Sequence, residues 1–241
     1  TVRAQMKKLE AIGRQLAVAP DQQVSLTDPD ARSMATSGRG TGMVGYNVQA
    51  AVDPEHHLIV EHEVVNEGHD RRQLSPMAQQ TKETLGTQDL TVLADRGYFS
   101  GEEILRCERA EIKALVPKPM TSNSTSSGRF DKRDFIYEPK RDRYRCPAGE
   151  YATRRFSSIE KGQVIHKYWS SACTRCPIRS ACTTDHYRRI NRWEHEDVVE
   201  RMQKRIDAMP QAGRLRRQTV EHTFGTLKSW MGATHFLTKR L

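Results

Sequence analysis

Apolar residues recur along the chain with two periods, and these periods predict its first helix and its first strands. A helix is expected over residues 1–19, where four apolar side chains lie at helical spacing: Met6, Leu9, Ile12 and Leu16. Two β-rich stretches follow at residues 46–52 and 58–65, separated by a short turn that contains Asp, Pro and Glu. This arrangement predicts a β-hairpin behind an N-terminal helix.

The segment after the hairpin carries the features of a helix start. Asp70 is a good N-cap for a helix that runs to about Leu85, because Gln73 stands at the capping-box position. Pro76 favours a second interpretation, in which the helix begins at Ser75. Both interpretations place one helix directly after the hairpin.

Two short apolar runs, at residues 90–94 and 112–116, are typical of buried strands. Ser100, with Glu103 three residues later, predicts a capping box for a helix between them. The order of elements over residues 46–117 is therefore β-β-α-β-α-β. An antiparallel hairpin followed by strands that can lie parallel indicates the α/β class.

The remaining segments differ in composition. Residues 37–45 are Gly-rich and residues 121–128 are rich in Ser, Thr and Asn, so both are expected to be loops. Residues 130–192 contain four cysteines and little apolar material for a core of their own. The pattern is helical again over residues 193–241, with a break at Pro210.

Composition excludes some classes of protein. Apolar residues make up 36% of the 241 residues, which is too many for a wholly disordered chain. The sequence has no run of about 18 apolar residues and no secretory signal, so neither a membrane span nor export is expected. Neither end of the sequence resembles a natural terminus, and we expect a fragment of a longer protein.

The net charge of +9 is unevenly distributed. Residues 201–241 contain nine Lys and Arg but only two Asp and Glu. Such a basic segment favours contact with a polyanion, most commonly nucleic acid, and the alternative is a solvated helix face. Four aromatic residues among arginines suit either DNA contact or the packing of a small core: Tyr168, Trp169, Tyr187 and Trp193.

The cysteines indicate a reducing compartment and a candidate metal site. Five occur, an odd number without a secretory signal, so a disulfide framework is not expected. Cys107 falls on the apolar side of a predicted helix and is expected in the core. Four others could close a tetrahedral zinc site through their thiolates: Cys146, Cys173, Cys176 and Cys182. His166 and His186 are further candidate ligands, and unliganded thiols are the alternative.

An acidic residue ends one of the predicted strands. Asp95 follows the apolar run at residues 90–94, which places its carboxylate at the sheet edge where ligands and metal ions bind in open α/β sheets. Gly97 lets the chain turn away and approach closely. The alternative is a structural role, in which Asp95 caps the turn that follows.

A second acidic residue lies on the last predicted helix. That helix carries a stripe of core residues at spacings of 4, 3 and 4: Val220, Phe224, Leu227 and Met231. Glu221 shares a helix face with Arg217, Gly225 and Lys228. Gly225 lowers helix propensity, which suggests a role in packing or in a close approach. The alternative interpretation of Glu221 is an ion pair with Arg217 on a solvated helix.

These residues resemble those of insertion-sequence transposases of the DDE class. Members carry a catalytic Asp after a core strand, commonly followed by Gly-Tyr, and residues 95–98 of this chain read Asp-Arg-Gly-Tyr. They also carry an Arg, a Glu and a Lys at spacings that Arg217, Glu221 and Lys228 reproduce, while Arg214 stands where a Tyr is expected. The stretches DPDARSM and GYNVQAAVD resemble a branch with a cysteine-bearing insertion before the Glu.

The resemblance implies a fold and a division of the chain. The fold would be a ribonuclease H-like mixed sheet flanked by helices and interrupted by a cysteine-rich insertion. Residues 1–27 would form a helical segment, residues 28–118 the first part of the core, and residues 119–192 the insertion. Residues 193–241 would supply the helices that carry Glu221.

The resemblance also implies metal-dependent cleavage of DNA strands and their transfer to a target. Asp95 and Glu221 would hold Mg²⁺ or Mn²⁺, since hard divalent ions prefer carboxylate oxygens. Arg217 and Lys228 would contact DNA phosphates. The partners would be double-stranded DNA and further copies of the chain, in the bacterial cytoplasm at the nucleoid. Two alternatives stay open: a non-catalytic, zinc-dependent DNA-binding remnant, and a metal-dependent nuclease without strand transfer.

The class has three catalytic acids, and the sequence offers two clearly. The first normally lies on the first core strand, ahead of the hairpin. Asp28 and Asp30 are the only acids in a suitable place, and beside Pro29 they are more typical of a turn. Asp70 is better explained as an N-cap. We therefore expect the first Asp to precede the helix at residues 1–19, and this chain to be inactive alone.

Overall fold

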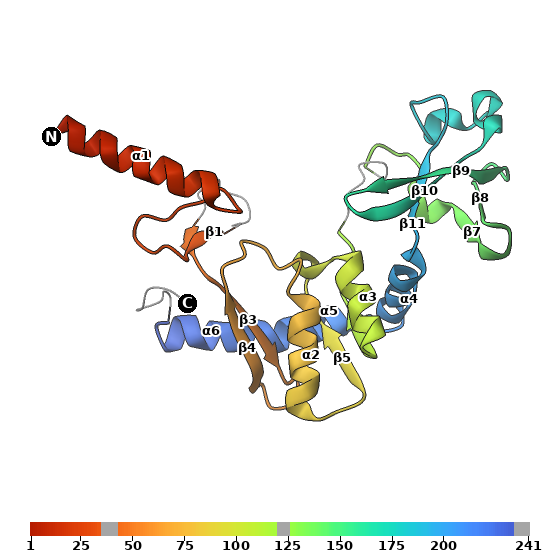
Figure 1. Cartoon of the computed structure of the whole chain (residues 1–241). Coiled ribbons are helices and arrows are strands. Elements are labelled where there is room, and N and C mark those ends of the chain that lie inside the picture. The colour runs from red at the N-terminus through yellow and green to blue at the C-terminus, as the bar shows by residue number, and fades with distance from the viewer. Residues whose placement is uncertain (35–42, 120–125, 234–241) are drawn as a thin grey trace. The chain divides into compact units, whose positions relative to one another are not determined.

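The computed structural model of the chain describes residues 1–34, 43–119 and 126–233 (Figure 1). Its backbone separates into two compact units. The first comprises Thr1–Pro117 and Met202–Leu241, and the second comprises Lys118–Arg201.

The first unit contains most of the elements that the apolar pattern predicts. In chain order they are α1 (Val2–Val18), β1 (Arg32–Met34), β2 (Met43–Gly45), β3 (Asn47–Val52), β4 (Ile59–Val65), α2 (Leu74–Leu85), β5 (Leu90–Leu93), the 3₁₀ turn η1 (Arg96–Tyr98), α3 (Gly101–Arg109) and β6 (Ile112–Leu115). Helix α4 (Glu196–Asp207) enters the unit from the second one, and α5 (Ala212–Arg216) follows the break at Pro210.

Two strand pairs confirm the predicted β-β-α-β-α-β order. β3 pairs antiparallel with β4, and β5 pairs parallel with β6, with Leu90 opposite Ile112. A continuous mixed sheet is not formed by the described residues, since these pairs remain separate two-stranded sheets. The α/β class is confirmed, and the ribonuclease H-like sheet stays a prediction.

Helix α2 begins differently from the prediction. Its N-cap is Gln73, and no side chain of its own segment caps it, so the N-cap role expected of Asp70 is wrong. The buried Glu103 of α3 instead accepts a hydrogen bond of 3.0 Å from the backbone N–H of Ser75. Glu103 thus satisfies an unpaired amide of a neighbouring helix, and the capping box with Ser100 is not formed.

The segments ahead of the hairpin contain one predicted helix and one pair of strands that was not predicted. Helix α1 confirms the first prediction, but none of its residues is buried. β1 and β2 pair antiparallel where a loop was expected at residues 43–45, and the rest of that expected loop lies outside the described residues. Pro29 stands in a turn, as expected.

The C-terminal helix contains two π-helical stretches. These are η6 (Arg217–Glu221) and η7 (Thr226–Trp230), on either side of the short α6 (His222–Gly225). A π-helix bonds each residue to the one five positions away, so its faces differ from those of an α-helix. Three residues of the predicted core stripe, Val220, Phe224 and Leu227, are half-buried, whereas the fourth, Met231, is 70% exposed. The buried residue of this stretch is Thr219.

The second unit has more structure of its own than its composition suggested. Its strands form one antiparallel sheet in the order β11-β10-β9-β8-β7. Their bounds are β7 (Ile136–Glu138), β8 (Arg143–Arg145), β9 (Tyr151–Glu160), β10 (Gln163–Trp169) and β11 (Ile190–Trp193). Four 3₁₀ turns precede or connect them: η2 (Lys132–Asp134), η3 (Pro139–Arg141), η4 (Ser171–Arg175) and η5 (Arg179–Ala181). Of the loop expected at residues 121–128, residues 121–125 lie outside the described part.

Aromatic residues form the core that the second unit was expected to lack. The buried cluster consists of Phe135, Tyr144, Ala152, Tyr168 and Ile190. The phenol groups of Tyr137 and Tyr168 donate hydrogen bonds of 2.9 and 2.6 Å to Asp142. Tyr168 and Trp193 are both buried, so these two aromatic residues pack within the protein and are not open to nucleic-acid bases.

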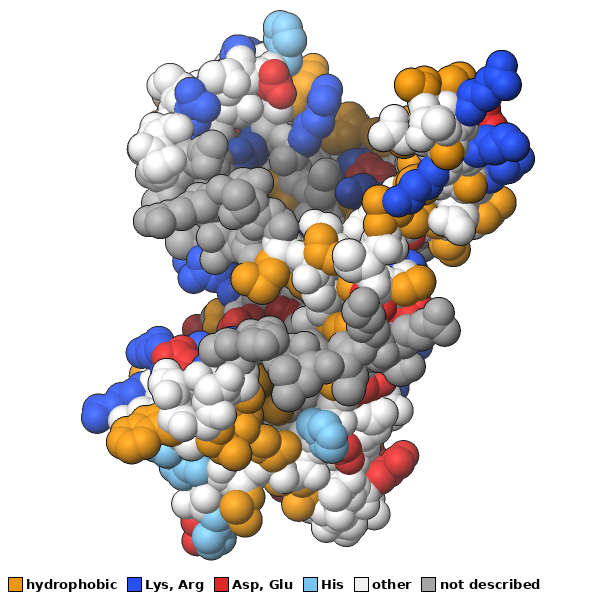
Figure 2. Space-filling model, turned by 90° about the vertical axis from the view of Figure 1, so that its left-hand side faces the viewer, with side chains coloured by type: hydrophobic (Ala, Val, Ile, Leu, Met, Phe, Trp, Pro, Cys, Tyr) orange, Lys and Arg blue, Asp and Glu red, His pale blue; other side chains and the backbone are white. Residues whose placement is uncertain are grey.

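The surface mixes charged and apolar side chains. Figure 2 shows hydrophobic side chains exposed among Lys and Arg on one face. Exposed apolar residues of the first unit include Met6, Leu9 and Leu16, which formed the predicted stripe of α1. No helix in the described part of the chain is long and apolar enough to cross a membrane.

Candidate functional site

Asp95 stands where the sequence placed it, just after the half-buried end of β5. The parallel pairing continues past the strand, since the N–H of Ala94 donates to the carbonyl of Leu115 at 3.1 Å. Asp95 is the N-cap of η1, and its Oδ1 accepts a hydrogen bond of 2.6 Å from the N–H of Gly97. The carboxylate therefore caps the turn that follows, which was the alternative interpretation of Asp95, and its Oδ1 is hydrogen-bonded within that turn.

Asp70 lies close to Asp95, although the sequence analysis set it aside. The space that Asp70, Asp95 and Gly97 border is called the acidic corner, or simply the corner. A Cβ atom placed on Gly97 would lie 2.9 Å from Oδ1 of Asp95 and 3.2 Å from Oδ2 of Asp70. The two carboxylates thus face one point, which is open only because residue 97 has no side chain. The prediction that Gly97 allows a close approach is confirmed.

Amide side chains from β3 hold Asp70 in place. Asn47 and Gln49 donate hydrogen bonds of 2.7 and 2.9 Å from their side-chain nitrogens to Oδ1 of Asp70. The buried Gln49 also accepts a hydrogen bond from the phenol of Tyr98, which follows Gly97 in η1. This chain of contacts ties the hairpin to both acids. Asn47 and Gln49 fall in the stretch GYNVQAAVD, and Gly97 and Tyr98 in Asp-Arg-Gly-Tyr, but nothing in the sequence indicates that these stretches meet Asp70.

The pKa of Tyr98 reflects the negative potential of the corner. Burial raises the pKa of its phenol, and the charges of Asp70 and Asp95 raise that pKa further. The positive charge of Arg216 acts in the opposite direction. Tyr98 therefore stays protonated and keeps its hydrogen bond to Gln49 across the physiological pH range.

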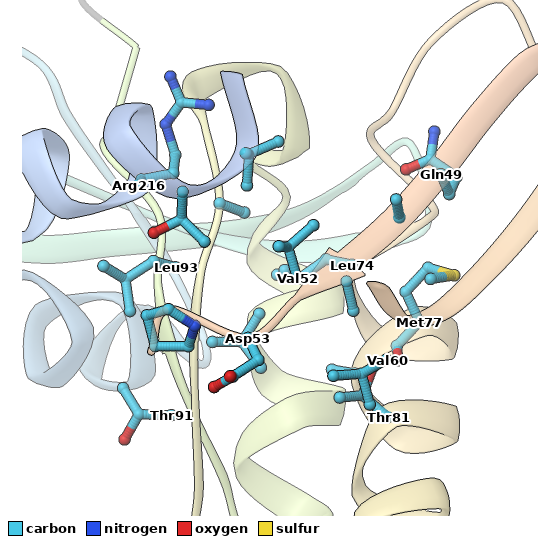
Figure 3. Close-up of a pocket in the computed structure, with 18 of the residues that line it drawn as sticks. Gln49, Val52, Asp53, Val60, Leu74, Met77, Thr81, Thr91, Leu93 and Arg216 are labelled. Atoms are coloured by element: carbon cyan, nitrogen blue, oxygen red, sulfur yellow. Dashed lines mark hydrogen bonds between the residues drawn. The ribbon is translucent and has the colours of Figure 1, made fainter. Parts of the chain in front are cut away.

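A mostly apolar cavity of about 370 Å³ adjoins the corner. Consecutive residues of β3 (49–52) and of the β5 segment (90–94) line it. Neighbouring side chains of a strand point to opposite faces, so a cavity that contacts consecutive residues lies at the edge of the strand. In Figure 3, Gln49 comes from β3 on one side of the cavity and Arg216 from the C-terminal helix on another. The cavity separates the two strand pairs that a continuous sheet would join.

Glu221 is not part of the acidic corner. Its side chain is 60% exposed and pairs with Arg216, with 3.2 Å between Oε1 and Nη2. The predicted pair with Arg217 is wrong, because the π-helical winding of η6 brings residues five apart onto one face. Within the described ranges no three His, Cys, Asp or Glu side chains are placed to hold a metal ion together.

The two predicted phosphate contacts lie on the same helix. Arg217 and Lys228 are both exposed, and the Lys228 ammonium lies 5.7 Å from the centre of the Phe224 ring. A Cβ placed on Gly225 would meet nothing within 4 Å, so the packing role expected of this glycine is wrong. The helix face that carries Arg217, Glu221, Gly225 and Lys228 is therefore exposed to solvent.

The four clustered cysteines line one small cavity in the second unit. Cys146, Cys173, Cys176 and Cys182 all contribute to its wall. They do not form a closed ligand set, so the structure does not support the predicted zinc site as it stands. His166 bonds Ser157 through Nδ1 at 2.7 Å, and neither it nor His186 lines that cavity. The core position of Cys107 is confirmed, and burial raises the pKa of its thiol to about 12.

The acids ahead of the hairpin have turn contacts. Oδ1 of Asp28 accepts from the N–H of Asp30 at 3.3 Å, and its Oδ2 accepts from the phenol of Tyr46 at 2.8 Å. The turn interpretation of Asp28 is therefore confirmed. Nothing in these contacts recruits Asp28 or Asp30 to the corner of Asp70 and Asp95.

A family model described as the transposase DDE domain matches residues 16–241. The chain belongs to this transposase family. No curated protein and no solved structure matches it. Membership in the family means that DNA is its partner and that transposition proceeds by DNA cleavage. Transposase DDE domains generally use divalent metal ions.

Proposed function

We propose that this chain is the catalytic part of an insertion-sequence transposase that cuts DNA strands and joins them to a target. The observation that carries the proposal is the convergence of Asp70 and Asp95 on one point at the carboxyl end of β5, in a chain of the DDE transposase family. Ligands of open α/β sheets bind at this edge. The proposed partners are double-stranded DNA and further copies of the chain.

The donor atoms of the corner suit Mg²⁺ or Mn²⁺. Oδ2 of Asp70 and the carboxylate of Asp95 are hard oxygen donors, as these ions prefer. Glu221 is the proposed third ligand, since its exposed ion pair with Arg216 costs little to break. When bound, the metal would stabilise negative charge on the oxygens of the transferred phosphoryl group.

The reaction has two steps in which this chain positions the reactants. In the first, a water oxygen attacks a DNA phosphorus atom, the bond to the 3′ oxygen breaks, and a 3′-hydroxyl is released. In the second, that hydroxyl attacks a phosphorus of the target and displaces its 3′ oxygen. Arg217 and Lys228 would hold neighbouring phosphates during both steps, because their exposed cations lie on the helix of Glu221.

Nicking of supercoiled plasmid in the presence of Mn²⁺ tests this proposal. The variants are Asp95→Asn, Asp70→Asn and Glu221→Gln. Asp89→Asn is the matched control, because Asp89 lies just ahead of β5, is exposed and pairs with Lys113. The proposal predicts nicking that each of the first three variants abolishes and the control retains.

The same assay separates the alternative functions. Equal nicking in the wild type and in Asp95→Asn would contradict the proposed site. Nicking without joining of a labelled element end would indicate a nuclease. A folded chain that binds DNA but never nicks would favour a binding module, or a catalytic domain whose first acid lies outside these residues.

A further inference from the structure

Residues far apart in the second unit bring four thiols to one place. Cys146 follows β8, Cys173 lies in η4, Cys176 directly follows η4, and Cys182 directly follows η5. All four line the same cavity of about 30 Å³. A volume of roughly 10–15 Å³ on this scale holds one water molecule, so the space suits a single ion.

Hydrogen-bonded turns hold each thiol at this cavity. The N–H of Cys146 donates to the carbonyl of Glu150 at 2.8 Å, and the N–H of Gly149 donates to the carbonyl of Cys146 at 2.9 Å. Gly149 has a φ of +83°, which favours glycine, so this turn depends on it. The N–H of Cys182 donates to Arg179 at 2.9 Å. The backbones that present the thiols are therefore fixed before any ligand is considered.

The cavity wall is mostly apolar, and two arginines, Arg179 and Arg188, contribute to it. Cys146 and Cys182 pack against the aromatic core of the unit. Arg188 also lines the cavity, and its Nη1 donates to the carbonyl of Cys182 at 3.4 Å. Its buried Nε–H has no hydrogen-bond partner among the residues that the structure describes. A buried donor without an acceptor is costly, and a nearby thiolate sulfur would both accept its hydrogen bond and balance its charge.

Four thiolates around one small cavity need a cation to balance their charge, because like charges disfavour one another. A single divalent ion would supply that charge.

We propose that these four cysteines form a structural zinc site in the second unit, with Arg188 balancing part of its negative charge. Zn²⁺ prefers four thiolate ligands in tetrahedral geometry at about 2.3 Å. Because the thiols do not yet form a closed set, the proposal requires their side chains to turn toward the cavity centre. The site would link the β8–β9 turn to η4 and η5, and it is independent of the proposed transposition chemistry.

Metal analysis of the purified full chain tests the proposal. We expect one zinc per chain by mass spectrometry, and a thiolate-to-metal charge-transfer band after replacement by Co²⁺. Cys146→Ser and Cys173→Ser should each lose the metal and the band. Cys107→Ala is the matched control, since it also leaves four cysteines but removes the one buried in the first unit.

The wild type alone can overturn the proposal, so it does not depend on the folding of any variant. A reduced wild-type chain that contains no zinc and gives no Co²⁺ charge-transfer band would show a metal-free, thiol-lined cavity. Zinc retained in both Cys146→Ser and Cys173→Ser would contradict the four-thiol ligand set.

Discussion

The two acids that the sequence analysis favoured stand in contrasting surroundings. Asp95 lies in a corner where a strand end, a 3₁₀ turn and two amide side chains of β3 fix the neighbouring carboxylates. Glu221 lies on a π-helical stretch, where it is exposed and pairs with Arg216. The comparison indicates that one half of the proposed site is preorganised, whereas the other half must move to join it.

The largest effect is expected when the corner itself is filled. Gly97→Ala would place a methyl group 2.9 Å from Oδ1 of Asp95 and 3.2 Å from Oδ2 of Asp70, so the carboxylates must shift. A displacement of about 1 Å can cost roughly 100-fold in rate, and we expect a loss of that order in Mn²⁺-dependent nicking.

Gly225→Ala is the matched control on the helix of Glu221. Nothing lies within 4 Å of the added methyl group, and alanine favours a helix over glycine by up to about 1 kcal/mol. The variant should nick DNA normally and unfold at a slightly higher temperature. Equal activity losses in both glycine variants would contradict the difference between the two regions.

A smaller effect is expected from the amide that joins the hairpin to the corner. Gln49→Leu removes the hydrogen bonds to Asp70 and Tyr98 and leaves a buried phenol without an acceptor. We expect a loss of about 2–3 kcal/mol in the free energy of unfolding, measured with urea. Gln79→Leu is the control, because the exposed Gln79 bonds only Ser75. A Gln49→Leu chain as stable as the wild type would contradict the proposed bracing.

The smallest effect concerns the ion pair of Glu221. A double-mutant cycle of Arg216→Gln with Glu221→Gln should give a coupling energy of about 0.2–1 kcal/mol, typical of exposed pairs. A double-mutant cycle of Arg217→Gln with Glu221→Gln should give no coupling energy. Coupling to Arg217 in place of Arg216 would show that this segment is wound as an ordinary α-helix.

Local patterns predicted much of the fold. The hairpin, the parallel pair β5–β6 and helices α1, α2 and α3 follow from apolar periods within single segments. The errors arise where a contact crosses segments. Glu103 has the spacing of a capping residue for its own helix, yet it caps α2. A sequence offers no means to distinguish these two partners.

The candidate site was predicted in the same uneven way. The position of Asp95 followed from a strand end, and the approach at Gly97 from the absence of a side chain. Asp70 was set aside because its neighbours resemble an N-cap, and only the folded hairpin brings it to Asp95. The change of partner from Arg217 to Arg216 depends on π-helical winding, which no residue spacing in the sequence indicates.

Binding of Mn²⁺ to the whole chain, followed by electron paramagnetic resonance, tests the central claim most directly. The claim is that Asp70 and Asp95 form the preorganised half of a metal site. It predicts that Asp95→Asn and Asp70→Asn each weaken binding at least about tenfold, while Asp89→Asn leaves it unchanged. Wild-type affinity in both corner variants would contradict the claim.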